Sequence, residues 1–70
     1  MKWIDTPESA TMSGFGYDEQ SQVLIVEFKN GGRYNYFDVP KDLFDQMVAA
    51  GSRGQFLTQN VKGIYRYARA

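Results

Sequence analysis

The sequence predicts an α+β domain, in which a three-stranded antiparallel β-meander is followed by two α-helices packed on one face of the sheet. Segment 23–36 consists of two β-rich runs joined by Asn30-Gly31-Gly32, and an Asn-Gly turn between such runs is typical of a β-hairpin. After Tyr36 the apolar residues recur with helical rather than alternating spacing. With 70 residues, the whole chain (1–70) is expected to form one small domain.

The first strand of the meander is predicted over about residues 9–17. Pro7 keeps the residue before it out of the helical region, so the start of the chain is expected to be an extended entry. Gly14 and Gly16 lie within the strand and indicate a β-bulge. Trp3 is expected to pack under the sheet, because a small core needs its area. The chain before the hairpin therefore supplies at most one strand.

The hairpin is predicted to join strands at about 22–29 and 32–38, and its loop length decides which side chains share a face. A two-residue loop, Asn30-Gly31, would place the two tyrosines of the second strand on the face of Glu27. A three-residue loop (29–31, with Gly31 left-handed) instead sets Glu27 opposite Arg33 as a favourable cross-strand ion pair. We favour the three-residue loop, because it produces one large aromatic core face: Leu24, Val26, Phe28, Tyr34 and Tyr36.

The first helix is predicted over about residues 40–50. Pro40 suits the first helical position, and Gly51 is expected to be a left-handed cap at the other end. The apolar residues between them fall on one helical face, which we expect to bury Phe44 and Met47 against the sheet.

The second helix is predicted to begin at Ser52, which forms a capping box with Gln55. Gly63 is expected to end it. The tail, residues 64–69, then alternates in the manner of a strand and is compatible with a short C-terminal strand at the edge of the sheet.

Composition excludes several kinds of site. The chain contains neither cysteine nor histidine, which excludes disulfides and the usual zinc sites, so its stability must come from its 11 aromatic residues or from self-association. No nucleophile motif or phosphate-binding loop is present, and the pair Asp42 and Asp45 is explained by helix electrostatics. We therefore expect a protein that is not an enzyme and that uses no catalytic residue, cofactor or metal. Without a membrane-length apolar run or a signal peptide core, it is expected to be cytoplasmic.

Charge is distributed unevenly along the chain. Residues 1–28 carry one lysine against five acids, whereas residues 46–70 carry four cations and no acid. Tyrosine and arginine alternate within this basic part, and aromatic faces interleaved with cations are what single-stranded nucleic acids bind. Four phosphate contacts predict a salt slope of magnitude about 3 and micromolar or weaker affinity. The candidate nucleic-acid-binding residues are Arg53, Lys62, Tyr65, Arg66, Tyr67 and Arg69.

Several short motifs, in order and spacing, resemble the KTSC domain over about residues 9–69. They are Gly16-Tyr17-Asp18, Leu24-x-Val26-x-Phe28, Gly32-x-Tyr34-x-Tyr36, Val39-Pro40, Ala50-x-Ser52-x-Gly54 and Lys62-x-x-Tyr65-x-Tyr67. That domain occurs at the C-terminus of some lysyl-tRNA synthetases and alone in bacterial and phage proteins. The resemblance implies a free-standing, non-catalytic member of unsettled function, and its synthetase association suggests RNA binding.

Two classes of function remain open at this point. The first is a binding module for RNA or single-stranded nucleic acid that uses the basic C-terminal half. The alternative is a protein–protein interaction module or homo-oligomeric accessory protein of bacterial or phage origin, which would need an exposed apolar patch or a bare sheet edge.

Overall fold

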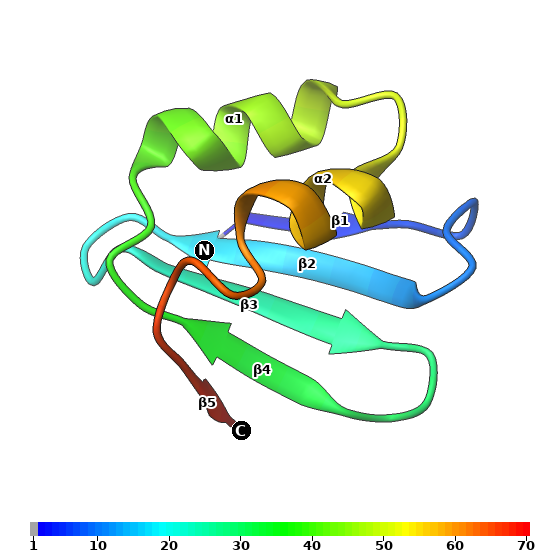
Figure 1. Cartoon of the computed structure of the whole chain (residues 1–70), viewed down its shortest axis with the longest axis horizontal. Coiled ribbons are helices and arrows are strands. Elements are labelled where there is room, and N and C mark those ends of the chain that lie inside the picture. Colours follow the sequence, from blue (N-terminus) through cyan, green and yellow to red (C-terminus); the bar gives the residue numbers. More distant parts are fainter. Residues whose placement is uncertain (1) are drawn as a thin grey trace.

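The computed structural model describes residues 2–70, which form five strands and two helices (Figure 1). The elements follow one another as β1 (Lys2–Asp5), β2 (Met12–Asp18), β3 (Val23–Phe28), β4 (Arg33–Tyr36), α1 (Lys41–Ala49), α2 (Arg53–Asn60) and β5 (Tyr67–Arg69). The α+β class with two helices after a meander is thus confirmed.

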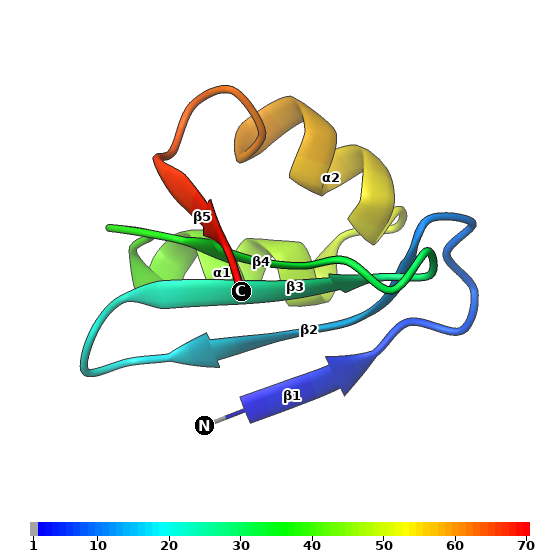
Figure 2. The same cartoon turned by 90° about the horizontal axis from the view of Figure 1, so that it is seen from below.

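The sheet has more strands than predicted. Its order is β1-β2-β3-β4-β5, every neighbouring pair is antiparallel, and β1 and β5 form its two edges (Figure 2). The prediction of at most one strand before the hairpin was wrong, because the chain reverses after β1 and pairs Ile4 with Phe15. The reversal is local: the Ser9 N–H donates to the Thr6 carbonyl at 3.1 Å, and the Thr6 hydroxyl donates to the Met12 carbonyl at 3.0 Å.

The three-residue hairpin loop is confirmed. The Phe28 N–H donates to the Gly32 carbonyl at 2.8 Å, which leaves residues 29–31 as the loop, and Gly31 has φ +95°. Glu27 lies opposite Arg33, and their side chains form an ion pair at 3.0 Å. This register places Tyr34 and Tyr36 on the same face as Leu24 and Val26 of β3.

Trp3 lies on the sheet face that points away from the helices, so it does not join the core. A Cβ atom added at Gly16 would lie 2.6 Å from Trp3 Cε3, which shows that the indole rests directly on the backbone of β2. The guanidinium of Arg33 lies 5.4 Å from the Trp3 ring on the same face. The expected β-bulge is present as a register shift between Met12 and Gly14.

The helices begin and end close to the predicted residues. Pro40 is the N-cap of α1 rather than its first helical residue, and Ser52 caps α2 by accepting a hydrogen bond from the Gln55 N–H. The predicted left-handed cap at Gly51 was wrong, because α1 ends at Ala50 in an extended conformation. Gly63 does adopt the left-handed conformation, with φ +78°, just after α2.

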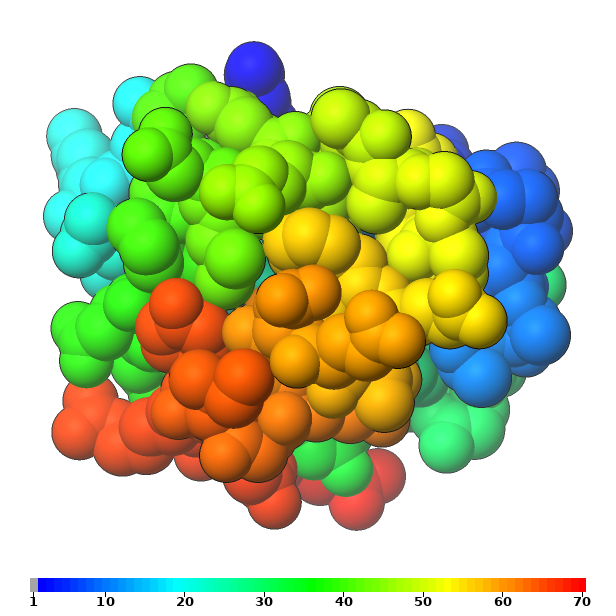
Figure 3. Space-filling model, turned by 45° about the horizontal axis from the view of Figure 1, so that its top comes forward, coloured from blue at the N-terminus to red at the C-terminus, as the bar shows by residue number. Residues whose placement is uncertain are grey.

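Both helices cover the same face of the sheet, and the core lies between the two layers (Figures 1 and 3). Phe44 of α1 stacks on Tyr17 with ring centroids 4.9 Å apart and meets Phe15 edge to face at 5.7 Å. The Tyr17 hydroxyl donates to the Val39 carbonyl, which ties β2 to the start of α1. The buried apolar residues are Met12, Phe15, Tyr17, Leu24, Val26, Tyr36, Val39, Phe44, Met47, Leu57 and Val61.

Replacing Phe44 by alanine is expected to lower the free energy of unfolding by about 3–5 kcal/mol, because it leaves a cavity between two aromatic rings. Urea denaturation measures this loss. Ile64→Ala is the control, because Ile64 is 64% exposed and its truncation should change stability by less than about 0.5 kcal/mol. A loss below about 1 kcal/mol for Phe44→Ala would contradict the packing of α1.

Gly16→Ala is expected to destabilise the fold by about 1–3 kcal/mol, because the new Cβ atom would overlap the Trp3 ring and the Lys2 carbonyl. Gly51→Ala is the matched control, since nothing lies within 4 Å of a Cβ atom there. Thermal denaturation compares the two variants. Equal melting temperatures would show that the Trp3 ring does not pack against the backbone of β2 at Gly16.

Candidate functional site

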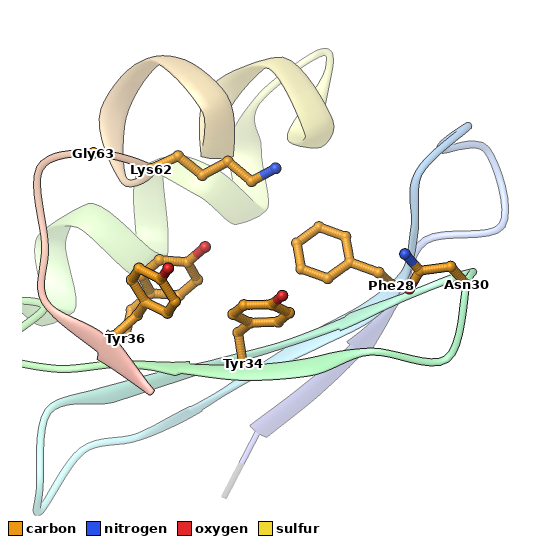
Figure 4. Close-up of a pocket in the computed structure, with 7 residues that line it drawn as sticks. Phe28, Asn30, Tyr34, Tyr36, Lys62 and Gly63 are labelled. Carbon is orange, nitrogen blue, oxygen red and sulfur yellow. The ribbon is translucent and has the colours of Figure 1, made fainter. Parts of the chain in front are cut away.

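A groove of about 390 Å³ lies between the sheet and the segment that follows α2. Strands β3 and β4 supply its floor, β5 supplies one side, and the turn at residues 62–63 passes over it (Figure 4). We call it the tyrosine groove. It is lined by Phe28, Asn30, Tyr34, Tyr36, Lys62, Gly63 and Tyr67.

The aromatic rings of the groove form a connected set. Tyr34 meets Phe28 edge to face, with centroids 5.5 Å apart and planes at 87°. On its other side Tyr34 lies 5.5 Å from Tyr67, which in turn lies 5.8 Å from Tyr36. The flat face of Tyr34 is turned toward Lys62, with Phe28 and Tyr36 to either side (Figure 4). This arrangement offers an open ring face on which a planar group can stack.

Two cations accompany these rings. The Lys62 ammonium lies 5.0 Å from the centroid of Phe28, and the Arg69 guanidinium lies 6.0 Å from that of Tyr34. Within residues 2–70 neither side chain has a carboxylate within 4.0 Å, whereas four other cations (Arg33, Lys41, Arg53 and Arg66) are ion-paired. No carboxylate lines the groove, so its charge favours an anionic or electron-rich ligand.

Two of the six residues predicted to bind nucleic acid, Lys62 and Tyr67, line the groove, and a third, Arg69, lies beside it with its guanidinium 6.0 Å from the Tyr34 ring. Tyr67 is 58% exposed and stands in β5 opposite Tyr36, so its ring is available for stacking. Tyr65 is half-buried and packs against the core, so only one tyrosine of the tail offers an open ring.

The other two predicted cations lie elsewhere. Arg53 donates twice to the Val48 carbonyl, at 3.2 and 2.8 Å, and lies 3.7 Å from Glu8, so it ties the start of α2 to its surroundings. Arg66 lies 5.2 Å from the Phe37 ring and 3.9 Å from the Asp38 carboxylate, neither of which lines the groove. Of the four cations in the basic half of the chain, two therefore lie at or beside the groove and two, Arg53 and Arg66, lie elsewhere.

From the sequence, Phe28, Tyr34 and Tyr36 were expected on the core face of the hairpin, and Asn30 was expected in its turn. Tyr36 is indeed buried, but Phe28 and Tyr34 are only partly covered. Beside Tyr34, β5 contributes the exposed Tyr67. Tyrosine recurs at alternate positions in both the hairpin and the tail, and this shared pattern could have indicated that the two segments contribute to one site.

Hydroxyl groups of three tyrosines line the groove. Burial raises the pKa of the Tyr36 hydroxyl above its ordinary value of 10.0, and the neighbouring Tyr34 and Tyr67 hydroxyls raise it further. Tyr36 therefore remains protonated at neutral pH and can donate a hydrogen bond into the groove.

Within residues 2–70, no helix is long and apolar enough to cross a membrane. The same residues contain no group of three or more acidic side chains placed to hold a metal ion.

Comparison with known proteins identifies the family. The model of the KTSC domain matches residues 8–67. The chain belongs to the KTSC domain family. The crystal structure of a KTSC domain protein from Yersinia pestis superposes with a TM-score of 0.92, at 25% identity, over 99% of this chain and 96% of that one. The family is thus the one that the sequence motifs indicated.

Curated relatives place the KTSC domain in two settings. A protein from Tsukamurella paurometabola is 39% identical over 84% of this chain and 88% of its own length. A lysine–tRNA ligase from Nostoc punctiforme is 33% identical over 87% of this chain, but this segment is only 11% of the ligase. The domain therefore occurs both as most of a short protein and as a small part of a tRNA ligase.

Tyr36→Phe is expected to make the protein less sensitive to alkali. Because the pKa of Tyr36 is higher in the folded than in the unfolded chain, its contribution to stability is complete below about pH 10 and is lost as the pH rises through the folded value. Urea denaturation at roughly pH 8 and pH 11 measures this loss. Wild type should lose more stability between the two conditions than the variant. Equal losses would show that the Tyr36 hydroxyl is not desolvated.

Proposed function

We propose that this KTSC domain binds single-stranded RNA through the tyrosine groove. The observation that carries the proposal is that an open tyrosine face and two cations lie together. Tyr34 lies 5.5 Å from Tyr67, Lys62 lies beside Phe28, and Arg69 lies beside Tyr34. Proteins that bind single strands stack bases on aromatic rings and place cations along the backbone. The groove supplies both kinds of contact on one side of the sheet.

The charges around the groove support an anionic ligand. Lys62 and Arg69 both lie beside groove aromatics, and within residues 2–70 no acidic side chain lies within 4.0 Å of either. A phosphate that binds Lys62 or Arg69 has no carboxylate to displace, so binding does not have to break an ion pair first. Arg53 and Arg66 would have to leave Glu8 and Asp38 before they could contribute.

The likeness to a segment of lysine–tRNA ligases supports RNA as the ligand, because the named substrate of those enzymes is a tRNA. The likeness extends over 87% of this chain. An RNA-binding role for the segment would serve such an enzyme as an additional contact to its substrate.

The proposal is tested by titrating a fluorescent single-stranded RNA of eight nucleotides at 50 mM salt. Tyr67→Ala should lower affinity by about tenfold or more, because base stacking on one ring contributes roughly 1–3 kcal/mol. Arg69→Glu should weaken binding by about fivefold or more, because it reverses one of the two groove charges. Arg66→Glu is the matched control: it makes the same charge change three residues away, outside the groove, and should leave affinity within about twofold of wild type.

The salt dependence provides a second measurement. Two phosphate contacts, from Lys62 and Arg69, predict a slope of magnitude about 1.4 in log affinity against log salt, whereas the four cations expected from the sequence predict about 3. A slope near 3 together with a strong effect of Arg66→Glu would mean that RNA follows the whole basic tail instead of the groove.

No RNA binding by the folded wild type would refute the proposal. The exposed side chains of Ile64 and Tyr67 would then support the second candidate, an interaction with protein or with a second copy. Sedimentation velocity on the same samples distinguishes the self-associating form from the monomer.

A further inference from the structure

The polar groups of the groove indicate which base it binds best. This inference rests on the proposed function. We infer that the tyrosine groove prefers keto bases, so that uracil binds better than cytosine. The inference depends on one side chain at the rim, Asn30, and on the kinds of hydrogen-bonding groups that surround the stacking face of Tyr34.

The orientation of the Asn30 amide is fixed by its own turn. The Gly32 N–H lies 2.9 Å from Asn30 Oδ1. Because a backbone N–H can only donate, the atom that faces it must be the carbonyl oxygen of the amide. The amide nitrogen therefore points away from the turn, and Figure 4 shows it on the side of Phe28. Asn30 thus presents a donor to the groove.

The remaining polar groups agree with this donor. The Lys62 ammonium can only donate, and Figure 4 shows it extended over the groove from the opposite side. The hydroxyls of Tyr34, Tyr36 and Tyr67 can donate or accept, so Asn30 and Lys62 supply the groups that select between bases. No carboxylate lines the groove, so no charged acceptor is available to pair with an amino group on a base.

The groove has room for a base, because its volume of about 390 Å³ lies near the lower end of the range for small-ligand pockets. Phe28 meets Tyr34 edge to face on one side, and Tyr67 lies 5.5 Å from Tyr34 on the other. A base stacked on Tyr34 would direct its edge toward Asn30 or Lys62. Uracil carries a carbonyl oxygen at each end of its pairing edge, so donors that reach in from two sides can each meet one. Cytosine carries an amino group at one of these ends, where it would face a donor.

The inference is tested by comparing U8 and C8 RNA, which have the same backbone and the same ring size. Wild type should bind U8 at least about fivefold more tightly than C8, because one hydrogen bond is replaced by a clash between two donors. Equal affinities for U8 and C8 would overturn the base preference and leave RNA binding itself standing. Absence of binding to both would instead refute the proposed function.

Asn30→Asp tests whether the Asn30 amide nitrogen causes the preference for uracil. One carboxylate oxygen can keep the bond from the Gly32 N–H, while the other takes the place of the amide nitrogen and accepts from an amino group. The added negative charge should weaken both ligands, but the ratio of U8 to C8 affinity should fall to about one or below. Lys29→Gln is the control: Lys29 does not line the groove, and losing its charge should weaken U8 and C8 equally. An unchanged U8 to C8 ratio in Asn30→Asp would overturn the assignment of the preference to Asn30.

Discussion

The pairing of β3 with β4 is the constraint on which the rest of the structure depends. The three-residue loop with left-handed Gly31 sets Glu27 against Arg33 and sends both tyrosines of β4 to the face covered by the helices. A shift of one residue would turn every side chain of β4 to the other face. The core would then lose Tyr36, and the groove would lose its floor. One turn thus fixes both the packing and the candidate site.

The two faces of the sheet are covered by different parts of the chain. The helix side holds the core at its centre and the tyrosine groove toward the β4–β5 edge, where the covering layer thins to the turn at residues 62–63. The other side has no helix, and Trp3 covers the glycines of β2 in place of one. This cover explains how a chain without disulfides can leave one sheet face open and still shield its backbone.

Local signals in the sequence were sufficient for the hairpin, α1, the Ser52 cap and the end of α2 before Gly63, because each depends on residues only a few positions apart. The N-terminal strand was missed because its pairing with β2 depends on a turn that has no glycine and only one proline. The groove was only half predicted. Tyr67 and Lys62 stood out by composition, but their partners Tyr34 and Phe28 are more than 25 residues away, and this distance is closed only by the return of β5.

The affinity of the groove depends on whether the short β5 strand is docked on β4. Its three residues are all exposed, and it forms one edge of the sheet through pairing with β4 alone. Such an edge detaches more easily than the strands that bracket the core. Only molecules in which β5 is docked have the Tyr67 wall, so the apparent affinity of any groove ligand is the intrinsic affinity multiplied by the docked fraction. Through this equilibrium, the docking of the last few residues on β4 sets the affinity of the groove in addition to the contacts that Tyr67 and Arg69 make themselves.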